Sequence, residues 1–262
     1  MADIGHQPLT AYVVALDKLC TEWIHGSHDD ATPPGEEEGS ICLDYLDTYG
    51  KQCDTSEMET AYTELRACKA QRHLDQAASH RRWLNLWYKL ITIADIDVED
   101  DLKDVVKVHD LSKYGPYEVL GYGIMFGETG RFKMLAGREK ELWDLALKSH
   151  YSSNPHHPQY QVGVAMDGVH LEESVLDMLA SRSERTLLGE SCVTPSQLMD
   201  VPEIYLTRYV PQDKDGVKVK LAGWLQKVEG VVNDRDGDAA EFIGQWEELS
   251  GKTLLIHASV NV

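Results

Sequence analysis

Apolar residues recur at intervals of three and four along much of this 262-residue chain. The clearest stretch runs from His80 to Ala94, where apolar side chains fall on one side of a helix and His80 extends the same stripe. Further helices are predicted over residues 11–23, 138–150, 169–185, 221–232 and 239–249. Another is expected to begin near Thr55 or Ser56, to run towards Leu74 and to be interrupted before His80. A helix starting at Thr194-Pro195 is also expected, with the threonine as its cap.

Glycine, proline and clustered charges mark the expected connections. Residues 27–40, which include the glutamates at 36–38, are expected to form a solvated loop. The four glycines of GYGIMFGETG at 121–130 predict a second loop, and 211–217 is a candidate linker. A short buried helix is expected from Val105 to Leu111, stopping at Gly115-Pro116, with His109 and Asp110 near its C-terminal end.

The pattern therefore predicts an all-α fold, because little in the chain favours a sheet. We expect an N-terminal helix and acidic loop over 1–54, a core over 55–210 and a C-terminal helical extension over 211–262.

Composition narrows the classes of partner. The formal net charge of −19 would repel the phosphate backbone of long nucleic acids. No apolar run is long enough for a membrane helix, and the first thirty residues do not have the pattern of a secretory signal. Five scattered cysteines fit a reducing compartment, so we expect a cytoplasmic protein, with the nucleus as the alternative. A small phosphorylated ligand is still allowed, since a bound cation can reverse the charge in a pocket.

Five of the eleven histidines, namely His80, His109, His150, His156 and His157, fall in one part of the chain. Imidazole combined with carboxylate suits zinc, iron, manganese or nickel. A divalent transition metal is therefore the expected cofactor.

The string Val108-His109-Asp110-Leu111-Ser112-Lys113 resembles the HD-x-x-K core of the HD superfamily. His80 stands 29 residues before His109 and resembles the first histidine of that superfamily, and Asp177 in LEESVLDMLASR resembles its closing aspartate. The resemblance implies an HD-type helical bundle around a metal held by His80, His109, Asp110 and Asp177, with additional helices at both ends.

The segment HYSSNPHHPQY at 150–160 resembles the extra histidines of two-metal HD proteins. It is more similar to an HD-like family of undetermined function that pairs HD-x-S-K with a later N-x-H-H-P. One or two ions are therefore expected, and a second would use His150 with either His156 or His157. Pro158 and Gln159 follow where the cyclic-dinucleotide phosphodiesterases have glutamate and a Gly-Tyr-Pro element, which argues against that specific activity.

The resemblance implies metal-dependent hydrolysis of a phosphate ester in a small substrate such as a nucleotide. Asp110 would orient the attacking water, while Lys113 and either His150 or His157 would offset charge or protonate the leaving oxygen. The alternatives are a di-iron oxygenase of the HD type and a metal-stabilised binding protein without turnover. The sequence does not indicate the oligomeric state.

Each candidate residue also has a structural alternative. His80 alone could be a core histidine bonded to a backbone carbonyl, and Asp177 could pair with a neighbouring arginine. His156 and His157 could decorate a surface turn, and Lys113 could be a solvated cation at a helix end.

Overall fold

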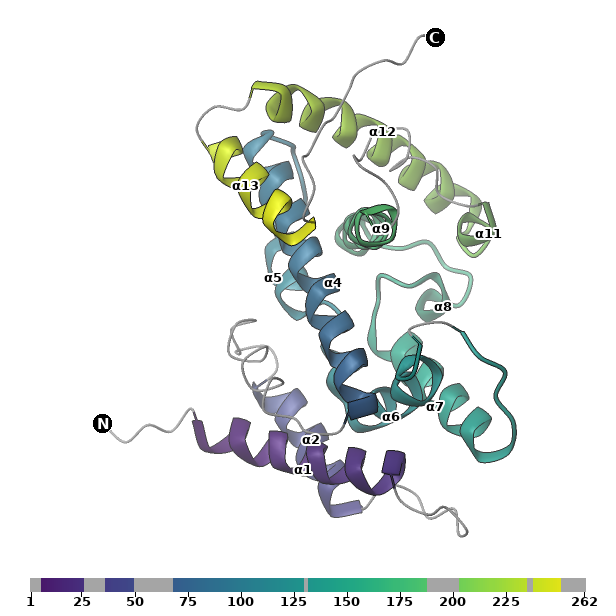
Figure 1. Ribbon diagram of the computed structural model, residues 1–262. Coiled ribbons are helices and arrows are strands. Elements are labelled where there is room, and N and C mark those ends of the chain that lie inside the picture. Colours follow the sequence, from purple (N-terminus) through teal and green to yellow (C-terminus); the bar gives the residue numbers. More distant parts are fainter. Residues whose placement is uncertain are drawn as a thin grey trace. The chain divides into compact units, whose positions relative to one another are not determined.

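The computed structural model describes residues 6–25, 36–49, 68–129, 132–187, 203–234 and 238–250. Every regular element in these ranges is a helix (Figure 1), which confirms the all-α prediction. None of these helices is long and apolar enough to cross a membrane. The chain divides into a first unit, residues 1–79 and 107–154, and a second unit, residues 80–106 and 155–262.

The first unit is built around helices from both of its segments. Its helices are α1 (His6–His25), α2 (Glu36–Tyr49), the beginning of α4 (Cys68–Ile93), the 3₁₀ helix η1 (Leu111–Tyr114), α6 (Pro116–Phe126) and α7 (Gly137–Ser153). Its core combines apolar side chains of α1, α2, α4, η1 and α6. The rings of Tyr12 and Tyr45 stack with their centroids 4.5 Å apart, and the Tyr12 hydroxyl donates to the carbonyl oxygen of Tyr114.

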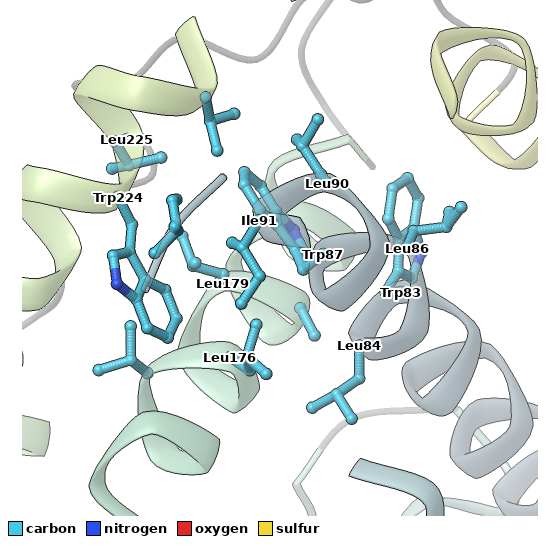
Figure 2. Close-up of a cluster of buried hydrophobic side chains, with 14 of the residues drawn as sticks. Trp83, Leu84, Leu86, Trp87, Leu90, Ile91, Leu176, Leu179, Trp224 and Leu225 are labelled. Atoms are coloured by element: carbon cyan, nitrogen blue, oxygen red, sulfur yellow. The ribbon is translucent and has the colours of Figure 1, made fainter. Parts of the chain in front are cut away.

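The second unit contains the tryptophan-rich core. Its helices are the remainder of α4, most of α5 (Leu102–Val108), α8 (Pro158–Gln161), α9 (Gly168–Leu187), α11 (Glu203–Leu206), α12 (Pro211–Asp234) and α13 (Asp238–Ser250). Figure 2 shows apolar side chains of α4, α9 and α12 converging in this core. Trp87 Nε1 donates to Ser183 Oγ over 2.8 Å, so the polar edge of a buried indole is satisfied.

The helices expected over 11–23, 80–94, 138–150, 169–185, 221–232 and 239–249 are confirmed as parts of α1, α4, α7, α9, α12 and α13. The interruption expected before His80 is wrong, because α4 continues through that residue. Residues 211–217 are the first turns of α12 rather than a linker. Pro211 stands at the start of this helix, where its missing N–H costs nothing.

The loop expected over 121–130 is largely wrong, because α6 extends to Phe126. A Cβ on Gly121 would lie 2.3 Å from the Cβ of Ala146 and 2.8 Å from the carbonyl oxygen of Leu142. The glycine is therefore explained by the close approach of α6 and α7 and not by a turn.

The solvated loop expected over 27–40 is wrong for its last residues, because α2 begins at Glu36. Glu38 accepts a hydrogen bond from Lys18 of α1, which lowers the pKa of its carboxyl group. The earlier part of that loop, the helix start near Thr55 or Ser56, and the expected cap at Thr194 lie outside the described residues.

Candidate metal centre

The His109-Asp110 doublet lies in a break between two helices. Asp110 has φ 54° and ψ 21°, in the left-handed region, and it separates the end of α5 from the start of η1. The single helix expected to carry the doublet is therefore wrong. Aspartate tolerates this backbone conformation better than most residues, because its short polar side chain can be satisfied locally.

Asp110 is the residue on which the polar contacts of the first unit converge. Its Oδ2 atom lies 3.5 Å from Nε2 of His109 and 2.6 Å from Nζ of Lys113. Its Oδ1 atom lies 3.8 Å from Nε2 of His150, which α7 supplies. The backbone break thus directs both carboxylate oxygens towards groups from separate elements.

Lys113 is an ion-pair partner rather than a solvated cation. Its side chain is 18% exposed, and its ammonium group contacts a carboxylate that is only 2% exposed. This pair offsets the negative charge of Asp110 in a buried position where an isolated carboxylate would be costly.

His150 is buried and is held from its other side by a glutamate. Its Nδ1 atom lies 3.0 Å from Oε2 of Glu118, a fully buried residue of α6. The other oxygen of Glu118 accepts a hydrogen bond from the hydroxyl group of Ser149 over 3.1 Å. Sequence reasoning missed Glu118 because it lies just before the glycine-rich stretch that was expected to be a loop.

His80 and Asp177 meet in the second unit. Nε2 of His80, on α4, lies 2.9 Å from Oδ1 of Asp177, on α9. His80 is buried, as its place on the apolar stripe predicted. Two residues 97 positions apart in the sequence therefore form one imidazole–carboxylate pair.

The turn before α8 places its two histidines differently. His156 is 1% exposed, so a surface role is wrong for this residue, whereas His157 is half-buried. Nδ1 of His156 lies 3.2 Å from Oε1 of Glu173, and Oε2 of the same glutamate lies 3.1 Å from Nδ1 of His170. The hydrogen bond that His170 donates to Glu173 raises the pKa of His170.

His73 is a further buried histidine that sequence reasoning did not select. Its Nε2 atom lies 3.0 Å from the backbone oxygen of Lys113, and its ring stacks on Tyr122 with the centroids 4.8 Å apart. Burial lowers its pKa to about 3. A carbonyl oxygen only accepts hydrogen bonds, so Nε2 must carry the proton, and this imidazole acts as a neutral donor.

The donor sets of both units fit a divalent transition metal. Two ligand atoms can share one ion when they lie within about twice a metal–nitrogen bond, roughly 4.2 Å. Asp110 with His109 and His150 satisfies this criterion in the first unit, as does His80 with Asp177 in the second. Each unit thus contributes buried histidine and carboxylate groups that could hold a metal ion.

The model of DUF5662, described as a family of unknown function, matches residues 67–205, just over half of the chain. The matched segment contains all the histidines and carboxylates of the candidate metal centre. No curated protein and no solved structure matches the chain.

Proposed function

Because the chain belongs to the DUF5662 family, which has no assigned function, we propose a function from the site: metal-dependent hydrolysis of a phosphate ester in a small substrate. His80, His109, Asp110 and Asp177 would hold one divalent cation, as in the HD superfamily that the sequence resembles. A small nucleotide is the first substrate class to test.

The observation that carries this proposal is the environment of Asp110. An imidazole lies near each oxygen of this buried carboxylate, so these groups together could bind a metal ion. The ammonium group of Lys113, 2.6 Å from Asp110, supplies a positive charge that could bind a phosphoryl group. An aspartate that only caps a helix at the surface would not need the two buried histidines, His109 and His150, beside its carboxylate.

The chemistry divides between the cation and the protein. A bound cation would lower the pKa of a coordinated water towards ~7 and offset charge on a phosphoryl oxygen. Asp110 would accept a hydrogen bond from the attacking water and orient it, and Lys113 would offset charge on the equatorial oxygens. His150 or His157 would donate a proton to the leaving oxygen, since an imidazole titrates near neutrality.

The charge of the chain favours a small substrate over a polymer. A net charge of −19 opposes the approach of long nucleic acids, whereas a cation and Lys113 act only on groups that enter the site.

Elemental analysis of the full chain, purified without chelator, is the first test. We expect one or two equivalents of zinc, iron, manganese or nickel. Asp110→Asn and Asp177→Asn should each remove the same equivalent, because the proposed ion uses both residues. Loss of different equivalents in the two variants would show that the pairs bind separate ions and would overturn the shared site.

Turnover is tested with a panel of nucleotides and other small phosphate esters. Asp110→Asn keeps a side chain suited to the left-handed backbone and should reduce phosphate release by at least about a hundredfold, since ligand and water are lost together. Asp104→Ala, at an exposed carboxylate of α5, is the matched control and should retain activity. An active Asp110→Asn enzyme would reject the proposal.

The histidines that are not among the four proposed ligands favour one alternative function, a di-iron oxygenase. Two irons per chain with visible absorption would support it, whereas a colourless metal with phosphate release would support hydrolysis. A metal-loaded protein without turnover on the whole panel would instead support a binding function.

A further inference from the structure

Two buried glutamates have no part in the proposed reaction, yet each faces a histidine of the candidate site. Glu118 on α6 lies 3.0 Å from Nδ1 of His150, within the first unit. Glu173 on α9 lies 3.2 Å from Nδ1 of His156, within the second unit. Of these two contacts, the one made by Glu118 has the geometry of a hydrogen bond.

The hydrogen-bond partners of His150 determine its tautomer. Nδ1 of His150 also lies 3.1 Å from Nδ2 of Asn154, which would require Nδ1 to be an acceptor. The two hydrogens of that amide, however, are used by the carbonyl oxygen of His150 and by Ser112 Oγ, each 2.7 Å away. Nδ1 therefore carries a proton and donates it to Glu118, which leaves a lone pair on Nε2.

Nε2 of His150 is the atom that faces Asp110, at 3.8 Å from Oδ1. The protonated Nδ1 and the lone pair on Nε2 are the state in which an imidazole binds a metal. The opposite tautomer would place a hydrogen on the atom directed at the site.

Glu173 contacts His156 in a different way. Oε1 of Glu173 lies 3.2 Å from Nδ1 of His156 without the geometry of a hydrogen bond, so this contact does not fix the tautomer of His156. Both side chains are candidate metal ligands themselves. Of the two histidines, His150 is therefore the one whose tautomer is fixed by a carboxylate, that of Glu118.

We propose that Glu118 is a positioning residue that keeps His150 in the metal-binding tautomer and orientation. The inference rests on the proposed metal centre and identifies His150 as an additional histidine ligand, so that His157 would be the proton donor to the leaving oxygen. Outer carboxylates of this kind typically change metal affinity by 10- to 100-fold.

Metal titration tests the proposal on the full chain. Chelator-stripped protein is titrated with Co²⁺, and the visible absorption of the bound ion reports affinity, stoichiometry and coordination. We expect Glu118→Gln to weaken Co²⁺ binding by about 10- to 100-fold and to alter the spectrum. An unchanged affinity and spectrum in this variant would overturn the inference.

Glu172→Gln provides the matched control. Glu172 neighbours Glu173 on α9 and is also buried, but its contacts are the backbone N–H of Glu99 at 2.9 Å and Nζ of Lys220 at 2.6 Å. It should lose stability on substitution and keep its Co²⁺ affinity. If Glu172→Gln weakened Co²⁺ binding as much as Glu118→Gln, a general structural effect would replace the proposed role.

The tautomer of His150 can also be measured without changing Glu118. In ¹⁵N-histidine-labelled wild-type protein, the signals lost in His150→Asn should be those of an Nδ1-protonated ring. An Nε2-protonated ring would refute the proposal even if Glu118→Gln did not fold. Failure of the wild-type protein to bind Co²⁺ would reject the metal centre itself, whereas normal Co²⁺ binding that is insensitive to Glu118→Gln would reject only the positioning role.

Discussion

Position 110 illustrates how much of the candidate site depends on one backbone conformation. In a continuous helix, adjacent histidine and aspartate side chains would point about 100° apart. The left-handed conformation of Asp110 instead ends α5 and brings its carboxylate to His109, Lys113 and His150. An ionic residue in this buried position is stable only with such partners.

His73 shows that a buried histidine near this carboxylate can have a different role. It is held neutral and donates to the backbone of Lys113, the residue that pairs with Asp110. Its effect on the site is therefore to support the segment that carries Lys113.

The stability of the protein should depend on pH through His73. Its folded pKa of about 3 is below the ordinary value of 6.5, so between these values the unfolded state binds a proton that the folded state does not. The contribution of the neutral His73 to the free energy of unfolding is fully present above pH 6.5. It falls as the pH is lowered, by up to about 1.4 kcal/mol per pH unit. Urea unfolding in the presence of chelator measures the free energy of unfolding at pH 7.5 and at pH 5.5. Between these pH values the wild-type protein should lose about 1 kcal/mol more of this free energy than His73→Gln, whose side chain cannot titrate. Parallel losses would contradict this role for His73.

At the scale of elements, the packing of α6 against α7 positions both Glu118 and His150. Gly121 allows this approach, since a side chain there would collide with Ala146 and with the backbone of Leu142. The glycine-rich composition of the stretch was interpreted as a loop because composition alone does not distinguish a turn from a close helix contact.

Gly121→Ala should therefore destabilise the protein, despite the higher helix propensity of alanine. Overpacking against a backbone oxygen costs about 1–3 kcal/mol, which exceeds the gain of up to about 1 kcal/mol from propensity. Gly223→Ala, in the interior of α12, is the control, because a Cβ there meets nothing within 4 Å and should stabilise by about 0.5–1 kcal/mol. Thermal unfolding of both variants measures the two effects, and a stabilised Gly121→Ala protein would argue against the tight contact.

At the scale of the whole molecule, the proposed ligands come from segments of both units. His80 and Asp177 belong to the second unit, and His109 and Asp110 to the first. A shared ion would bind the folded chain and not the unfolded one, so metal binding and folding should be linked.

Chelation should therefore lower the thermal midpoint of the wild-type protein. An ion at a hundred times its Kd contributes about 2.7 kcal/mol, equivalent to a shift of several degrees for a chain of this size. Circular dichroism with and without EDTA measures the shift. Asp110→Asn should respond little to EDTA, and a wild-type midpoint that does not move would argue against a tightly held ion.

The sequence by itself determined the helices whose apolar stripes are long and regular, such as α9 and the part of α4 from His80 onwards, and it placed His80 and Asp177 on them. It could do so because burial of one helix face imposes a local repeat that is visible in any window of the chain. Only the tertiary structure decided the left-handed turn at Asp110, the helical state of residues 121–126, and the partners Glu118 and Glu173. These features depend on contacts between residues that lie far apart in the sequence, which no local periodicity records.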